Sequence, residues 1–125
     1  MTTKKTSPRL DLARRGEGLA AMLLERAGYV IVARNARTRW GEIDLVARDG
    51  ETWVFVEVKT RTSDRYGTGA EAVTPQKQHK ILRMAEIILS RLSLADVPVR
   101  FDVVEVMLEP DRAPALRLVQ GAFGE

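Results

Sequence analysis

The stretch that decides the fold is GEIDLVARDGETWVFVEVKT, residues 41–60. It holds two runs rich in β-branched and aromatic residues, separated by Asp49-Gly50. Asp-Gly between two such runs predicts a β-hairpin, because a type I′ turn needs positive φ at both central positions. With a two-residue loop, Arg48 pairs with Glu51 and Asp44 pairs with Phe55.

The alternation of side chains along a strand then sorts this hairpin into two faces. Asp44, Glu57 and Lys59 share one face, since side chains point to opposite sides with a period of two. In this register Asp44 and Glu57 are diagonal neighbours, roughly 7–8 Å apart at the backbone. The other face is apolar and predicts core; it consists of Ile43, Leu45, Ala47, Val54, Val56 and Val58.

Two carboxylates and an ammonium group on a half-buried sheet are unfavourable unless they pair or bind a metal. One interpretation is a structural salt bridge of Lys59 with either acid, and the hairpin pattern by itself leaves that open. The other is a site for a hard divalent cation, because Mg²⁺ takes one or two carboxylates together with water and phosphate oxygens. Asp44 and Glu57 would then be direct ligands, joined by the Val58 carbonyl. Lys59 would orient or help to deprotonate an attacking water.

The rest of the chain predicts an α/β protein. A helix is expected over 11–27, a strand over 29–34 and a turn over 35–41, followed by the hairpin. After a polar loop over 60–73, Thr74-Pro75 opens a second helix, since Thr suits the N-cap and Pro the first helical position. Strands over 99–108 and 115–119 complete an α-β-β-β-α-β order, with an extra edge strand at the end of a central mixed sheet flanked by helices.

Each of the two predicted helices carries a charged residue near its inward side. Glu17 lies at the border of the inward stripe of the first helix, and Lys77 should point inward at the start of the second. His79, the single histidine, falls on the polar face of the second helix, so we exclude it from the site.

Length and composition predict one domain. We expect residues 1–10 to be a basic, disordered tail and residues 11–125 to be the folded domain. The net charge of +3 comes from Lys4, Lys5 and Arg9. The chain has no cysteine, which fits a reducing cytoplasm. No apolar run is long enough for a membrane span, and the first residues lack the apolar region of a signal peptide.

Asp44 and Glu57-Val58-Lys59, taken with this element order, resemble the motif of the PD-(D/E)XK nuclease superfamily. Ile43 stands where a proline often precedes the aspartate. More closely, GEIDL (41–45), FVEVK (55–59) and RFDVV (100–104) are similar to the YraN-type family of uncharacterised bacterial proteins, and Gly16-Glu17 and VTPQK (73–77) also fit.

The resemblance implies a restriction endonuclease-like fold, closest to archaeal Holliday junction resolvases, and a nucleic-acid substrate. It adds Glu17 to the site as a third acid that binds metal through water. It also implies a symmetric homodimer as a candidate assembly, with the last strand as one contact.

The first functional hypothesis is therefore an endonuclease that uses Mg²⁺, or Mn²⁺, to hydrolyse DNA, with branched or junction DNA as a candidate substrate. Its catalytic residues would be Glu17, Asp44, Glu57 and Lys59. Candidate phosphate contacts surround the charged end of the hairpin: Arg37, Arg39, Arg61, Arg65 and Lys77.

Two alternatives remain. One is a nucleic-acid-binding protein of the same fold without catalysis. The other is a scaffold in which the acids and Lys59 form a fold-specifying ion-pair network. In a scaffold, Asp44→Ala should be strongly destabilising, because it leaves Lys59 unpaired.

Overall fold

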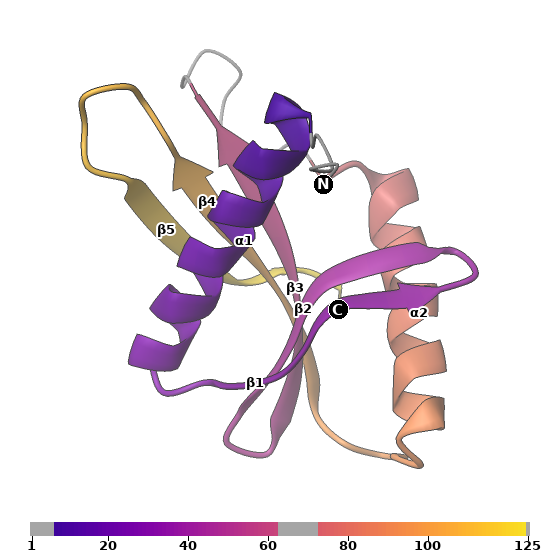
Figure 1. Ribbon diagram of the computed structural model, residues 1–125. Coiled ribbons are helices and arrows are strands. Elements are labelled where there is room, and N and C mark those ends of the chain that lie inside the picture. Colours follow the sequence, from indigo (N-terminus) through magenta and orange to yellow (C-terminus); the bar gives the residue numbers. More distant parts are fainter. Residues whose placement is uncertain (1–6, 63–72, 125) are drawn as a thin grey trace, which may run out of the picture.

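The structure, a computed structural model, describes residues 7–62 and 73–124. In these residues a twisted five-stranded sheet separates two helices, as Figure 1 shows. The elements in chain order are α1 (Pro8–Arg26), β1 (Val30–Thr38), β2 (Gly41–Asp49), β3 (Thr52–Arg61), α2 (Pro75–Arg91), β4 (Val99–Met107) and β5 (Ala115–Phe123).

The sheet order is β1-β2-β3-β4-β5. Only β3 and β4 are parallel, and α2 lies in the connection between them. A parallel pair needs such a crossover, while the antiparallel pairs are joined by shorter turns. The sheet is therefore mixed, and β5 is an edge strand. The predicted αβββαβ core of a restriction endonuclease-like fold, with an extra C-terminal edge strand, is confirmed.

The register of the β2–β3 hairpin differs from the prediction. Asp49 pairs with Thr52 and Arg48 with Trp53, so the turn residues are Gly50 and Glu51 rather than Asp49 and Gly50. The predicted pairs Arg48–Glu51 and Asp44–Phe55 are wrong by two residues. A shift of two residues does not turn a strand over, and Asp44 and Glu57 still line one common hollow. The shift moves them from diagonal positions to directly opposite ones.

Helix α1 begins before the expected position. Ser7 is the N-cap, its Oγ accepts a hydrogen bond from the Leu10 N–H at 3.1 Å, and Pro8 opens the helix. The prediction of a helix start at Asp11 is wrong, and residues 8–10 belong to the helix rather than to a tail. The helix ends at Arg26, one residue before the predicted end, with Ala27 as its C-cap. Gly28 follows the cap with a φ of 96°, which suits a residue without Cβ.

Two strand ends also differ from the prediction. Strand β1 runs to Thr38, into the segment expected to be a turn, and β5 runs to Phe123 rather than Val119. Helix α2 begins as predicted, with Thr74 as its N-cap and Pro75 in its first turn.

Each face of the sheet carries its own apolar core. On the α1 side, Leu45, Ala47, Val54 and Val56 pack with Leu24 and neighbouring residues. On the α2 side, Val46 and Phe55 pack with Ile81, Ala85 and Ile88. Ile43 belongs to the α2 side, not to the face of Leu45 as expected. The sheet is therefore covered on both faces, and polar side chains of β2 and β3 find solvent only where the strands end or separate.

A buried polar network joins β4 and β5 to Tyr29. Asp102 is 0% exposed and accepts hydrogen bonds from Arg100 Nε at 2.9 Å, the Tyr29 hydroxyl at 2.9 Å and the Gly121 N–H at 3.0 Å. Gln120 in turn donates to the Tyr29 hydroxyl at 2.7 Å. A buried carboxylate with several donors is well satisfied, so this network is structural.

Candidate metal and nucleic-acid site

The site lies where β2 and β3 separate. Their ladder runs from Asp49–Thr52 to Leu45–Val56 and goes no further. Beyond this point β2 stays paired with β1 as far as Gly41, while β3 stays paired with β4 as far as Arg61. Asp44 and Glu57 are the first residue on each strand beyond the ladder. The two carboxylates therefore stand at the base of a fork between two strands.

Beyond the end of the backbone ladder, the Asp44 side chain provides a hydrogen-bond acceptor for β3. Its Oδ2 accepts a hydrogen bond from the Val58 N–H at 2.8 Å. Burial, followed by the nearby charge of Glu57, raises the pKa of Asp44 to about 7. Within the described residues Asp44 forms no ion pair, so its negative charge is incompletely compensated.

Two lysines compensate the negative charge of Glu57. Its Oε1 lies 2.6 Å from Lys77 Nζ and 3.3 Å from Lys59 Nζ. Burial lowers the pKa of Lys59. Burial acts in the same direction on Lys77, but its contact with Glu57 outweighs that effect and raises the Lys77 pKa. Lys59 thus pairs with Glu57 and not with Asp44, and the predicted inward orientation of Lys77 is observed.

Glu17 reaches the same place from α1. Burial raises its pKa, and a hydrogen bond from Asn35 acts against that rise. Asn35 has a φ of 51° in the middle of β1, a conformation that Asn tolerates better than most residues. The third acid implied by the family resemblance therefore lies in the site, supported by a β1 residue that the sequence did not single out.

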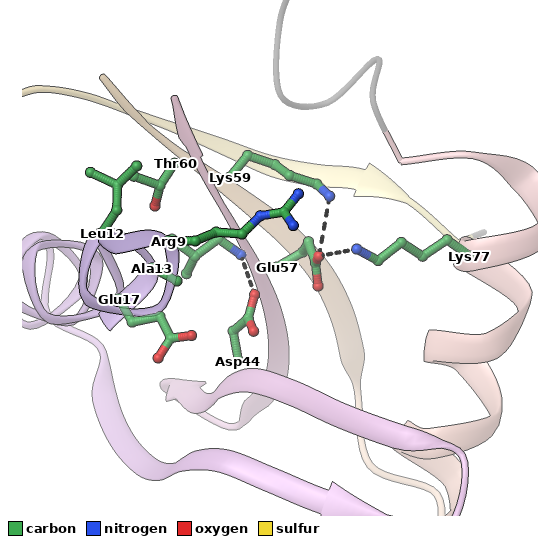
Figure 2. A pocket seen from close by; sticks show the side chains of 10 residues that line it. Arg9, Leu12, Ala13, Glu17, Asp44, Glu57, Lys59, Thr60 and Lys77 are labelled. Atoms are coloured by element: carbon green, nitrogen blue, oxygen red, sulfur yellow. Dashed lines mark hydrogen bonds and ion pairs between the residues drawn. The ribbon is translucent and has the colours of Figure 1, made fainter. Parts of the chain in front are cut away.

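These side chains surround an open hollow of about 580 Å³. Figure 2 shows Glu17 on the α1 side, Asp44 and Glu57 at the fork, and Lys77 approaching Glu57 from α2. The lining residues are Arg9, Leu12, Ala13, Glu17, Asp44, Glu57, Val58, Lys59, Thr60 and Lys77. Arg9 was assigned to the tail. The Ser7-Pro8 pair, an N-cap followed by proline, was the signal that places it on the helix.

The donor set fits a hydrated divalent cation. Two opposed carboxylates are what Mg²⁺ commonly takes from a protein, with water and substrate oxygens completing the shell. Asp44 and Glu57 supply them, and Glu57 already attracts cationic groups in this structure. In the described part of the chain, no three His, Cys, Asp or Glu side chains form a ready metal cluster. Any ion here would depend on water and substrate for most of its ligands.

The predicted phosphate contacts are not all brought to the hollow. Lys77 lines it. Arg37 lies in an adjoining hollow beside Glu17 and pairs with Glu42 at 2.9 Å. Arg39 packs over Trp40 at the tip of the β1–β2 hairpin. Arg61 ends β3 with a buried Nε that has no hydrogen-bond partner among the described residues. Arg65 lies outside the described residues.

The fold and the site together define an α/β protein of restriction endonuclease-like architecture. Residues 16–106 match the model of the uncharacterised protein family UPF0102. The chain belongs to this family.

Curated relatives carry the same family name. A UPF0102 protein of Symbiobacterium thermophilum is 55% identical over 108 residues, covering 86% of this chain and 92% of that protein. One of Geobacter sulfurreducens is 52% identical, covering 87% and 85%. A solved structure of Hjc, a Holliday junction resolvase of Archaeoglobus fulgidus, matches with a TM-score of 0.46 and 17% identity, over 85% of this chain and 73% of that one.

Neither helix in the described residues is long and apolar enough to cross a membrane.

Proposed function

We propose that this protein is a Mg²⁺-dependent endonuclease acting on DNA, with branched or junction DNA as a candidate substrate. The observation that carries the proposal is the placement of Asp44 and Glu57 opposite each other at the fork, with Lys59, Lys77 and Glu17 around the same hollow. The sequence resemblance to PD-(D/E)XK nucleases supports the same chemistry. Mn²⁺ is the expected substitute ion.

Each residue has a role that follows from its position. Asp44 and Glu57 would hold the ion, with the Val58 carbonyl as a third oxygen. The Val58 N–H faces Asp44, and the N–H and C=O of a strand residue point to the same side. Glu17 would bind through water. When bound, the metal would supply Lewis acidity and neutralise phosphate charge.

Lys59 and Lys77 act on the reacting groups. Lys59 would orient the attacking water and help to remove its proton, while Lys77 would hold a non-bridging phosphate oxygen. The water oxygen forms a bond to phosphorus and the bond from phosphorus to the leaving oxygen breaks. The proton of the water passes to solvent with the help of Lys59, and the leaving oxygen takes up a proton from solvent. Removing charge repulsion and fixing the water both lower the barrier.

Cleavage assays test the proposal. Linear, single-stranded and branched DNA would be incubated with Mg²⁺ or Mn²⁺ and wild-type protein, Asp44→Asn or Glu57→Gln. We expect each variant to lose at least about 100-fold in rate, as for the loss of one preorganised electrostatic contact. Glu51→Gln, in the β2–β3 turn at the opposite end of the strands, is the matched control and should retain activity. Equal cleavage by wild type and both site variants would show a contaminant and end the proposal.

A second candidate, a nucleic-acid-binding protein without catalysis, is favoured by one observation. Lys77 and Lys59 already compensate Glu57, so this acid does not require a metal. Calorimetry with Mn²⁺ separates the two candidates. The nuclease should bind the ion, and Lys77→Met should bind it more tightly because a competing cation is removed. The binding protein should show salt-dependent DNA affinity and no heat of Mn²⁺ binding.

A further inference from the structure

The tip of the β1–β2 hairpin presents an exposed aromatic ring that the proposed reaction does not use. Trp40 is 44% exposed and lies between the two strands, next to Arg39. The guanidinium of Arg39 is 5.6 Å from the Trp40 ring centroid. These two residues line a shallow hollow of their own. An exposed Trp with an Arg on its ring is a common element of surfaces on which nucleic-acid bases stack.

The hairpin tip is held rigid. The Thr38 hydroxyl donates to the Gly41 carbonyl at 3.0 Å and accepts from the Trp40 N–H at 3.1 Å. Further along, Arg91 of α2 donates to the Arg37 carbonyl at 2.8 Å. Figure 1 shows this end of the hairpin reaching across α2. These bonds fix the backbone that carries Trp40, which reduces the entropy lost when a ligand binds.

Two hollows lead from the acid site along this hairpin. One contains Gly41, Glu42 and Lys80 and shares Glu57 and Lys77 with the acid site. The other shares Glu17 with the acid site and continues past Arg14 and Arg37. Lys80 lies against Gly41, the residue that follows Trp40. The path from the acids to the tip is therefore flanked by cationic side chains on both sides, with Glu42 as the acid between them.

We propose that Trp40 is a base-stacking contact for an unpaired nucleotide, and that Lys80 and Arg37 guide the phosphates between it and the Asp44–Glu57 site. This inference rests on the proposed function and narrows its substrate to nucleic acid with unpaired bases near the bond that is cut. A base inside a duplex has both faces stacked and cannot use the ring. The sequence-independent nature of stacking makes the contact tolerant of base identity.

The distance along the hairpin sets the position of the unpaired base. Trp40 is four residues from Asp44 along the strand, roughly 13 Å at about 3.3 Å per residue. At a rise of about 3.4 Å per nucleotide this corresponds to about four nucleotides. If the DNA strand is stretched, fewer nucleotides span the same distance.

Binding is tested without metal, so that it is independent of cleavage. The full chain is titrated in chelator with three oligonucleotides of equal length: single-stranded DNA, a duplex with a four-nucleotide gap, and a fully paired duplex. Trp53→Phe leaves Trp40 as the single tryptophan, and its fluorescence should be quenched by the first two. Trp40→Ala should weaken binding to those two by about five- to a hundred-fold. Trp40→Phe should retain most of the affinity.

The controls distinguish base stacking from a general loss of DNA affinity. Met22→Ala removes a side chain that is 50% exposed on α1 and should leave every affinity unchanged. Affinity of Trp40→Ala for the paired duplex should change less than about twofold, since that contact is electrostatic. The inference is overturned if the fluorescence of Trp40 is not quenched. It is also overturned if Trp40→Ala binds all three DNAs with wild-type affinity, or if its affinity for all three falls by the same factor. Quenching together with a failed cleavage assay would reject the nuclease and retain this contact.

Discussion

At the scale of single residues, the two carboxylates at the fork are not equivalent. Glu57 lies in contact with two ammonium groups, whereas Asp44 has a single backbone donor and a raised pKa. Of these two carboxylates, Asp44 is thus the one whose charge the metal-free fold compensates less. A scaffold held together by Asp44 and Lys59 would show the opposite pattern, because their pairing would favour the charged form.

Replacing Asp44 should therefore stabilise the metal-free protein. Between the ordinary pKa of 3.8 and the raised value of about 7, the folded state binds more protons than the unfolded state. The free energy of unfolding must then fall as pH rises through this window. Asp44→Asn keeps the acceptor for the Val58 N–H and removes the charge, so at pH 8 it should gain on the order of 1–3 kcal/mol.

Urea denaturation of wild type and Asp44→Asn from pH 4 to pH 8 checks this. Glu17 also has a raised pKa, so part of the slope should remain in the variant. Asp111→Asn, in the exposed turn after β4, controls for the loss of one negative charge elsewhere. A strong destabilisation by Asp44→Asn would support the scaffold instead.

At the scale of elements, the close approach of α1 to β3 places Glu17 in the site. Gly16 is buried in the helix, and a Cβ added there would lie 1.9 Å from the Thr60 Oγ1. Because any larger residue would push the helix outward, the glycine sets the distance between α1 and the fork. The Gly16-Glu17 pair in the sequence thus combines a packing requirement with a site residue.

Gly16→Ala should consequently destabilise the fold by about 1–3 kcal/mol, although Ala is the better helix former. Gly18→Ala is the matched control, since nothing lies within 4 Å of its added Cβ, and it should stabilise by about 0.5–1 kcal/mol. Adding Thr60→Ala to Gly16→Ala should recover part of the loss. Thermal unfolding of the four proteins measures these effects, and equal behaviour of the two glycine variants would contradict the packing argument.

At the scale of the whole molecule, the Asp102 network and the fork differ in how far protein groups compensate a buried carboxylate. The Asp102 network joins β4 and β5 to Tyr29, and Arg100 also pairs with Asp49 of β2 at 3.0 Å. Asp102 accepts hydrogen bonds from Tyr29, Arg100 and Gly121, so this network has the fold-specifying role that the scaffold hypothesis assigned to Asp44. At the fork, the charge of Asp44 is less completely compensated.

Truncation of the network should show this difference. Asp102→Ala leaves Arg100 and the Tyr29 hydroxyl without their main partner and should destabilise by about 3–5 kcal/mol. Tyr29→Phe removes one donor and should cost about 1–3 kcal/mol. Chemical denaturation of both, beside Asp44→Asn, provides the comparison. A loss below 1 kcal/mol for Asp102→Ala would show that this network is not essential to stability. The homodimer stays a prediction, open to sedimentation analysis.

The sequence by itself determined the hairpin, the proximity of Asp44, Glu57 and Lys59, and the start of α2 at Thr74-Pro75. These features are local, because strand alternation and helix caps depend on residues close in the chain. The proximity of these three side chains survived a register shift of two residues, because an even shift does not turn a strand over.

The tertiary structure decided the fork, the pairing of Lys77 with Glu57, and the entry of Arg9 and Glu17 into the hollow. Asp44 meets Glu57 beyond the end of the β2–β3 ladder only because β2 follows β1 while β3 follows β4. That divergence depends on pairing between strands far apart in sequence, which no local pattern encodes.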